Sequence, residues 1–578
     1  MRLTNYNLIE HRQPNRASAR ILKVTLMKTD KQSNRIQLSA PAMCAITRTS
    51  TRRASNSLGA WLMAAFLAAG AALASAATIN VPGDQPTIVD ALGVANPSDE
   101  IVIQSGTYDE ADLLYVWAPL TLRATNGLVT VHVPSNKSAV AQVPGGVTNV
   151  VFDGIKFERL SADNDWMRSV EITGAASFTN CTFTGPANGV GVILFSGGDA
   201  TFDSCTFSNF ISTASWAAAI FMQNQGSSFS DVIVRNSTFD TGCNAWIRAF
   251  DNTNSWPRVG ELTLSNCTFK AARYNHGVKF RDGGATKMHY DPTKALLFQD
   301  CTFEGTTLEI AEFHYTSSTN KPLSLTFSRC EFKAYNSTRK MFWLDLPTPI
   351  VFEDCLFAGG QHQTIMTVWG GPPSVNFYHC TMINDGYAVG TPQSSFIYGW
   401  DGGRTFNIVN CLFRCTNNYT AAFVGDAGSS TNRNYAVSYS VIDHATPVGA
   451  KTQITAGTGY SNTSLAPAFV NEASRDYHLV NGSPWVNGGT DLGYLLDLDG
   501  NARNQGGTPD MGAFESSFAP VTPTVSVTTS LGNVVVTFTG VLQSADQVQG
   551  PFTDVPSAVS PQTVAPTGTN LFWRARSP

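Results

Sequence analysis

The chain has 578 residues, of which 43% are hydrophobic and only 14% are charged. This composition can build a large core and excludes a disordered chain. Residues 1–76 hold 11 of the 38 basic and 2 of the 43 acidic residues, so the remainder keeps 27 basic and 41 acidic residues, a net charge of −14. Such an acidic surface excludes nucleic acid as the expected partner.

The N-terminal region has the pattern of a targeting segment. Residues 60–73 form an apolar run that is too short to span a membrane, with Arg52 and Arg53 before it and an A-x-A site ending at Ala76 after it. Met43 is the better start, so we predict a disordered extension at 1–42 and a signal peptide at 43–76. Cleavage near Ala76 would place the protein outside the cell or on its surface. No later run is long enough to span a membrane, and we expect a monomer.

A six-residue phrase recurs in the middle of the chain at intervals of 24 to 34 residues, which is typical of a solenoid. The copies are β-branched and aromatic with no helical period, so each is predicted to be strand. Central copies include FTNCTF at 178–183, FDSCTF at 202–207, LSNCTF at 264–269, FQDCTF at 298–303, FEDCLF at 352–357 and IVNCLF at 408–413. With end copies at 152–157 and 437–442, the repeats predict about 10–11 coils.

The third residue of each phrase lies where the strand register breaks. In six of nine central copies it is Asn or Asp, namely Asn180, Asn236, Asn266, Asp300, Asp354 and Asn410. These residue types tolerate the left-handed conformation that a one-residue corner needs. Strand, corner and strand, stacked coil on coil, predict an all-β fold, a parallel β-helix.

The fourth residue is cysteine in eight copies, with Ser237 as the interruption: Cys181, Cys205, Cys267, Cys301, Cys330, Cys355, Cys380 and Cys411. Disulfides or a metal site are the alternatives, because an exported protein is in an oxidising compartment. We favour an inward ladder of free thiols. Metal motifs cluster their cysteines within a few residues, whereas these lie a full coil apart.

The segments ATINVPGDQPTIVDAL, DEIVIQSGTYDE and LTLRA, all within 77–124, resemble the start of the pectin-lyase-like family of right-handed parallel β-helix proteins. The likeness extends to residue 515. It implies a right-handed β-helix over 77–518 with a short capping helix at 86–93. Residues 465–490 and 497–515 look like the closing segment of bacterial surface β-helix proteins.

The family fold is shared by lyases, hydrolases, esterases, epimerases and non-enzymes, so it does not name a reaction. The catalytic motifs of polygalacturonases and the paired-arginine motif of pectate lyases are absent, so no catalytic residue is carried over. After a Pro-containing linker at 519–523, residues 524–578 alternate apolar and polar. They predict a small β-sandwich-like module.

A second strand follows each phrase, and its centre lies 12 to 14 residues after the cysteine position in most coils. If the centres face inward, their neighbours face out. The outward residues are then Arg248, Lys279, Arg281, Glu312, His314, Trp343, Asp345, Trp369, Tyr398 and Trp400. Aromatic residues bordered by charges predict a glycan-binding groove. Two alternatives are a satellite cluster under long loops and a register that is wrong by one residue. That slip would bury Lys279, Arg281 and Glu312 in the core, at high cost.

Two catalytic mechanisms fit these residues. In a lyase, Lys279 would be the base, with Arg248 and Arg281 holding uronate carboxylates. In a glycoside hydrolase, Glu312 and Asp345 would be the carboxylate pair, roughly 8 Å apart as in inverting enzymes. His314 completes the polar centre. We assign Arg248 and the aromatic residues to substrate binding: Trp343, Trp369, Tyr398 and Trp400.

Two function classes remain open. The first is a secreted protein that binds and cleaves polysaccharide, as a lyase or a glycoside hydrolase. The second is a non-catalytic surface or adhesion β-helix protein. In both, the partner is a polysaccharide or cell-surface glycan. No metal ligands are predicted, and Ca²⁺ is expected only if the protein is a lyase.

Overall fold

The structure is a computed structural model. It describes residues 76–578 except 160–166, 186–188, 196, 211–216, 224–227, 241–244, 250–257, 271–275, 281–287, 305–308, 314–320, 334–340, 360–363, 369–372, 385–394, 400–404, 416–423, 427–432, 444–451, 463–464, 466–468, 519–522, 557, 566–570 and 577–578. The extension at 1–42 and nearly all of the signal peptide lie outside the described residues.

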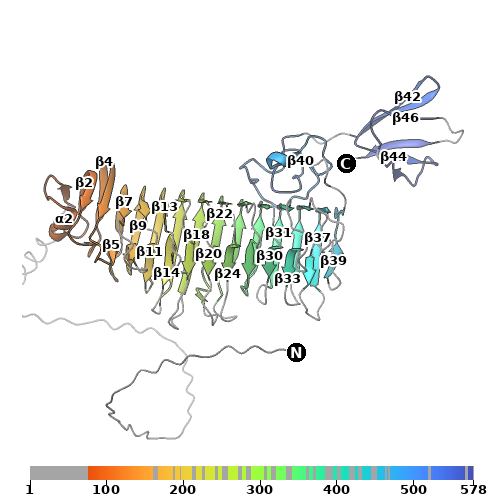
Figure 1. The fold of residues 1–578 in the computed structure, drawn as a ribbon. Coiled ribbons are helices and arrows are strands. Elements are labelled where there is room, and N and C mark those ends of the chain that lie inside the picture. Colours follow the sequence, from red (N-terminus) through yellow and green to blue (C-terminus); the bar gives the residue numbers. More distant parts are fainter. Residues whose placement is uncertain are drawn as a thin grey trace, which may run out of the picture. The chain divides into compact units, whose positions relative to one another are not determined.

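Each repeating unit contributes three strands, and each strand pairs in parallel with its equivalent in the next coil (Figure 1). We call the strand before the corner the first face, the strand after it the second face and the remaining strand the third face. In one coil these are β12 (Asp199–Asp203), β13 (Thr206–Ser208) and β14 (Ile220–Gln223). This arrangement is a right-handed parallel β-helix, as predicted.

The first and second faces are joined at the corners into one 27-stranded sheet. Its first-face strands are β1 (Thr78–Val81), β2 (Glu100–Asp109), β4 (Thr121–His132), β6 (Val150–Asp153), β9 (Ala175–Thr179), β12, β15 (Ser230–Arg235), β18 (Arg258–Ser265), β21 (His289–Tyr290), β22 (Leu296–Gln299), β25 (Leu325–Ser328), β28 (Ile350–Glu353), β31 (Ser374–Tyr378), β34 (Thr405–Val409), β37 (Arg433–Ser438) and β39 (Thr452–Ala456). Its second-face strands are β7 (Ile155–Glu158), β10 (Thr182–Thr184), β13, β16 (Thr238–Phe239), β19 (Thr268–Lys270), β23 (Thr302–Glu304), β26 (Glu331–Lys333), β29 (Leu356–Gly359), β32 (Thr381–Asn384), β35 (Leu412–Cys415) and β38 (Val441–Asp443).

The third face is a separate sheet of 12 strands. They are β3 (Leu114–Tyr115), β5 (Ala139–Val143), β8 (Met167–Ile172), β11 (Gly189–Phe195), β14, β17 (Ile247–Ala249), β20 (His276–Phe280), β24 (Glu309–Phe313), β27 (Phe342–Leu344), β30 (Thr364–Val368), β33 (Ser395–Gly399) and β36 (Val424–Asp426). The strands from β11 to β36 are those that the sequence placed after the phrases.

Every central phrase turns its corner at the predicted residue. The third residue of all nine copies has a positive φ, between 48° at Arg329 and 58° at Asn410. The six Asn and Asp residues take this left-handed conformation, and so do Ser204, Arg329 and His379. The corner is therefore a property of the position in the coil, and Asn or Asp is the residue type that adopts it most easily.

The eight ladder cysteines are buried and free, which confirms the predicted thiol ladder. Cys181 donates to the carbonyl oxygens of Thr179 at 3.3 Å and of Phe152, one coil earlier, at 3.4 Å. Where Ser237 replaces the thiol, its hydroxyl donates to the Arg235 carbonyl and accepts the backbone N–H of Cys205. Burial raises the pKa of the Cys355 thiol well above its usual range.

Phenylalanine side chains stack along the core from coil to coil. Phe178 lies parallel to Phe152 and to Phe202, with ring centroids 5.0 Å apart in each pair. A second stack runs through Phe183 and Phe207, at 4.8 Å. Backbone pairing between neighbouring coils sets this spacing, which is about 4.8 Å between strands, so the aromatic positions of the phrase stack directly on one another.

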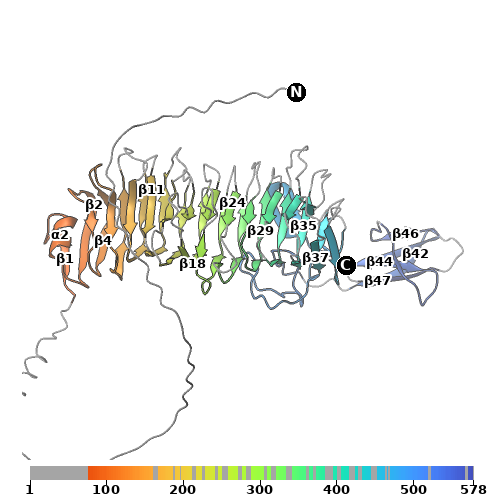
Figure 2. The ribbon, with the colours of Figure 1, turned by 90° about the horizontal axis from the view of Figure 1, so that it is seen from below.

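The N-terminal end of the stack is capped by α2 (Ile88–Val94), close to the predicted 86–93 (Figure 2). Thr87 is its N-cap and accepts the backbone N–H of Asp90. The buried carboxylate of Glu110 accepts two further N–H groups, from Ile88 and Val89. These bonds satisfy donors that a helix start leaves open, while the apolar side of the helix covers the core.

Residues 465–516, which we call the closing segment, cover the outside of the second face. The segment contains β40 (Phe469–Asn471), the 3-10 helix η1 (Glu472–Ser474) and β41 (Asp476–Leu479). Its apolar side chains join a buried cluster with outward residues of β29, β32, β35 and β38: Leu356, Ala358, Ile383, Leu412 and Val441. Outward positions are apolar in these coils because the closing segment removes them from water.

Residues 523–576 form two small antiparallel sheets. One joins β42 (Thr524–Ser530), β43 (Asn533–Thr539) and β46 (Gln562–Val564), and the other β44 (Val541–Ala545), β45 (Thr553–Asp554) and β47 (Phe572–Arg576). Val536, Phe538 and Leu542 form the buried core between them. In the described part of the chain, no helix is long and apolar enough to cross a membrane.

Candidate functional site

The third face aligns the predicted site residues in one column. Strand pairing places Arg248 next to Lys279, Lys279 next to Glu312 and Glu312 next to Trp343. The column continues through Thr367 to Tyr398. The intervening residues are fully buried and belong to the core: Ala249, Phe280, Phe313, Leu344 and Val368. Their burial confirms that the strand centres face inward, as the sequence predicted, while the roles of the neighbouring residues stay predictions.

Outward orientation does not make these side chains accessible. Arg248 is 6% exposed and Glu312 is 0% exposed, whereas Trp343 and Asp345 are partly exposed. One coil before Arg248, Phe221 is 1% exposed in an outer apolar cluster with Ile193. The satellite cluster weighed as an alternative is therefore present at Phe221. The column is apolar and buried at β11 and β14, and it carries charged residues at β17, β20 and β24.

Burial and charge act together on the buried pair. Burial lowers the pKa of the Arg248 guanidinium to about 10, and the Glu312 carboxylate two coils away opposes this shift. Charges interact strongly when water is excluded, so the two groups favour each other's ionised form over that distance. The column therefore contains a buried cation, Arg248, a buried carboxylate, Glu312, and the partly exposed indole of Trp343 in the coil after Glu312.

Asp345 lies one coil and two residues from Glu312, as the hydrolase hypothesis requires. Its backbone N–H donates to the Phe313 carbonyl at 3.0 Å, which continues the pairing of β24 and β27 by one step. Burial, with a contribution from Asp345, raises the pKa of the Tyr290 phenol on β21. The Asp345 carboxylate is thus close enough to the first face to affect the ionisation of Tyr290.

The remaining predicted site residues are Lys279, Arg281, His314, Trp369, Tyr398 and Trp400. Lys279 and Tyr398 are placed on their strands by backbone pairing, and their side chains are not described. Arg281, His314, Trp369 and Trp400 lie outside the described residues.

Among the described residues, no group of three His, Cys, Asp or Glu side chains is placed to hold a metal ion. The acidic side chains of Asp231 and Glu261 on the first face instead share Lys294, at 3.3 and 3.5 Å.

Sequence reasoning missed the N-terminal end of the same column, where Tyr115 pairs with Gln142 and Gln142 with Glu171. Tyr115 is 48% exposed, and Trp117, two residues later, is 45% exposed. The signal was the alternation in Tyr115-Val116-Trp117, which follows the same pattern as the later strands. No repeat phrase precedes this strand, so the register argument did not reach it.

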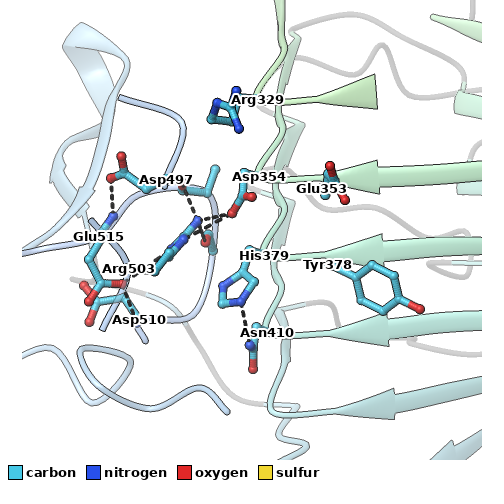
Figure 3. A network of polar contacts seen from close by, with 12 residues as sticks. Arg329, Glu353, Asp354, Tyr378, His379, Asn410, Asp497, Arg503, Asp510 and Glu515 are labelled. Atoms are coloured by element: carbon cyan, nitrogen blue, oxygen red, sulfur yellow. Dashed lines mark hydrogen bonds and ion pairs between the residues drawn. The ribbon is translucent and has the colours of Figure 1, made fainter. Parts of the chain in front are cut away.

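Sequence reasoning also missed a buried polar network where the closing segment contacts the corners (Figure 3). Arg503 donates to Asp354 at 2.5 and 3.1 Å and to the carbonyl oxygens of Gly512 and Ala513. Both side chains are almost fully buried. The carboxylates of Asp497, Asp510 and Glu515 each accept two or more backbone N–H groups of the segment. The polar residues of 497–515 therefore hold the closing segment in place.

Asn410 supplies a second contact at the corners. Its side-chain amide donates to the Thr490 carbonyl at 2.7 Å and accepts the Thr490 N–H at 2.9 Å. The Asn410 carbonyl also accepts the N–H of Gly512 at 2.7 Å. A corner residue chosen for its backbone conformation therefore also recognises the closing segment.

No protein-family model matches the sequence, and no curated protein sequence matches it. Solved structures with similar folds include a pectin methylesterase from Aspergillus niger, with 15% identity, a TM-score of 0.26 and coverage of 56% of this chain and 89% of that chain. The pectate lyase Pel9A gives 13% identity, a TM-score of 0.28 and coverage of 76% and 97%. A mannuronic-acid-specific polysaccharide family 6 lyase from human gut microbiota gives 13% identity and a TM-score of 0.28, with coverage of 67% of this chain and 82% of that chain. The strand pairing of the chain itself shows a parallel β-helix.

Proposed function

We propose that the protein is an exported β-helix protein that binds polysaccharide on its third face. The column of Arg248, Lys279, Glu312 and Trp343 on four consecutive coils is the observation that carries the proposal. The equivalent outward positions of the second face hold Thr206, Thr238, Thr268 and Thr302, which is what a solvated strand needs. Burying Arg248 and Glu312 costs free energy, so a charged column is retained for more than folding.

A glycan fits the chemistry of this column. Adjacent coils are about 4.8 Å apart, so successive outward side chains can contact neighbouring parts of one extended chain. The partly exposed indole of Trp343 offers a platform for the C–H face of a sugar ring. Arg248 and Lys279 supply positive charge on an otherwise acidic protein. This positive charge attracts an anionic polysaccharide to the column.

Cleavage by this column depends on residues with different accessibility. In a lyase, Lys279 would remove the proton next to the uronate carboxylate, with Arg248 stabilising the developing charge. In a hydrolase, Glu312 and Asp345 would share the acid and base roles. The complete burial of Glu312 disfavours direct contact with a polymer. The same observation favours the second candidate function, a surface or adhesion protein that binds glycan without cleaving it.

A panel of purified polysaccharides would test both activities, with reducing ends and unsaturated products as separate readouts of hydrolysis and elimination. Trp343→Ala should weaken binding by about 1–3 kcal/mol, because it removes the ring platform. Tyr378→Ala, which removes an outward aromatic from the first face, is the matched control and should bind normally. If no polysaccharide binds, or if both variants bind like the parent, the third-face proposal is wrong.

If the protein is a lyase, Lys279→Met should abolish turnover and leave binding intact, because a general base acts mainly in the transition state. Glu312→Gln should do so if the protein is a hydrolase. Binding without any product from the parent would leave the non-catalytic function. Export can be tested separately. N-terminal sequencing of secreted protein should start at or near Ala77, and a start before residue 60 would exclude the predicted signal peptide.

A further inference from the structure

A pocket of about 440 Å³ lies where the closing segment meets β26 and β29 on the second face. Its volume falls in the range of about 300–1,000 Å³ that is usual for small-molecule sites. The β-helix contributes Glu331, Lys333 and Leu356, and the closing segment contributes Ser474, Arg475, Asp476, Tyr477, His478, Asp499 and Phe514. Because it opens on the second face, this pocket is separate from the column of the third face.

Five charged groups of the pocket form ion pairs with one another. Lys333 contacts Glu331 at 2.6 Å, and Glu331 also accepts a hydrogen bond from Thr302. The two ring nitrogens of His478 contact Asp476 and Asp499, each at 2.6 Å. These pairs fix the carboxylates in place and leave the pocket with little net charge of its own.

Aromatic packing holds the histidine still. The His478 ring lies 4.2 Å from the Phe514 ring, measured between centroids, and Phe514 is itself part of the apolar cluster under the closing segment. The pocket thus has an apolar floor of Leu356, Tyr477 and Phe514 beneath a set of oriented carboxylates.

This pairing limits the kind of ligand. Three carboxylates and three basic groups line the pocket, so neither a simple anion nor a simple cation meets a site of one charge sign. The basic groups are Lys333, Arg475 and His478. A metal ion is disfavoured because each nitrogen of His478 faces a different carboxylate, so the three groups do not converge on one point. A carboxylate that already accepts one bond keeps further lone pairs, and these suit hydroxyl donors.

We propose that this pocket is a second ligand site, which binds a neutral mono- or disaccharide through hydroxyl groups donated to Glu331, Asp476 and Asp499. Sugar rings combine hydroxyl edges with apolar C–H faces, which matches a polar wall above an apolar floor. Since the second face carries this site, it adds to the proposed function of the third face and does not depend on it.

Saturation-transfer NMR with the methyl glycosides of glucose, galactose and mannose would test the site on the full mature chain. At least one glycoside should receive saturation from the parent protein. Ser474→Trp places a bulky indole at the exposed rim and should lower the affinity at least about tenfold, about 1.4 kcal/mol, because the side chain takes space that the ligand needs. Ala473→Trp is the matched control, since Ala473 is an exposed neighbour that does not line the pocket.

Glu331→Gln is a second test that leaves the closing segment unchanged, and it should also weaken binding about tenfold. The proposal fails if no glycoside shows transfer, or if Ser474→Trp and Glu331→Gln both bind like the parent. Trp343→Ala should not change glycoside binding, and Ser474→Trp should not change polysaccharide binding. Failure of this site and failure of the third-face proposal would therefore be distinguishable.

Discussion

The corners of the β-helix use one backbone conformation in two different settings. From Asn180 to Asp300 the corner side chains are exposed, and several form a ladder along the surface, as where Asn266 donates to Asn236 at 2.8 Å. From Asp354 to Asn410 the corner side chains are buried under the closing segment. The φ angles do not differ, with 52° at Asn266 and 53° at Asp354.

The comparison separates two roles of one residue position. In the exposed corners, Asn is selected for its tolerance of the left-handed conformation, and its hydrogen bonds compete with water. In the buried corners, the same conformation aims a side chain at a partner far along the chain, as when Asp354 meets Arg503. Buried polar groups must be satisfied, so the second set of corners fixes where the closing segment packs.

The largest effect should come from breaking the buried ion pair. Arg503→Met leaves Asp354 buried without its cation, and such losses cost about 3–5 kcal/mol. We expect hydrogen exchange to rise throughout the closing segment, while the coils before β25 stay protected. The double variant Arg503→Met/Asp354→Asn should recover part of the loss, because it removes the buried charge and keeps a corner-compatible residue.

Arg329→Met is the matched control for this experiment. Arg329 also pairs with a corner carboxylate, Asp300, but at a more exposed position, where ion pairs contribute about 0–1 kcal/mol. Equal destabilisation by the two methionine variants would show that burial does not distinguish the two sets of corners.

A smaller contrast should appear when the same substitution is made at two corners. Asn236→Ala and Asn410→Ala both force alanine into the left-handed region, at a cost of about 1–2 kcal/mol. Asn410→Ala also removes the paired hydrogen bonds with Thr490 and should cost about 1–3 kcal/mol more. Denaturant unfolding of the two variants measures the difference directly, and a difference near zero would contradict the proposed role of Asn410.

These contrasts show what the sequence could and could not predict. The corner, the thiol ladder and the inward register follow from local rules that repeat in every coil, so the phrase at 178–183 already contained them. The partner of Asp354 lies 149 residues away, and no local pattern distinguishes a buried aspartate corner from an exposed one. The burial of Glu312 was missed for a related reason, because strand alternation predicts direction and not what covers the outward side.

A pH effect should separate the corners further. Burial, with a contribution from Arg503, lowers the pKa of His379 to about 2. Below pH 6.5 an unfolded histidine binds a proton that the folded one does not, so stability is lost as the pH falls from about 6.5 towards 2, by up to about 1.4 kcal/mol per pH unit. Burial raises the pKa of the nearby Asp354 carboxyl, and the Arg503 guanidinium opposes that shift.

His379→Asn would isolate the histidine contribution, because asparagine keeps the corner conformation and does not titrate. Between pH 6.5 and 5 the variant should lose less stability than the parent. If the stabilities of the two proteins changed in parallel with pH, His379 would take up its proton as readily in the folded state as in the unfolded state.

The smallest effect is expected at an exposed corner with a conformationally free residue. Asn266→Gly removes the hydrogen bond to Asn236, but glycine adopts positive φ without strain and water replaces the exposed bond. We therefore expect a change in unfolding free energy within about 0.5 kcal/mol, as for most surface substitutions. A loss above about 1.5 kcal/mol would show that the exposed Asn ladder stabilises the coils through its side chains. The exposed corners would then resemble the buried ones in kind, and burial would change only the size of the effect.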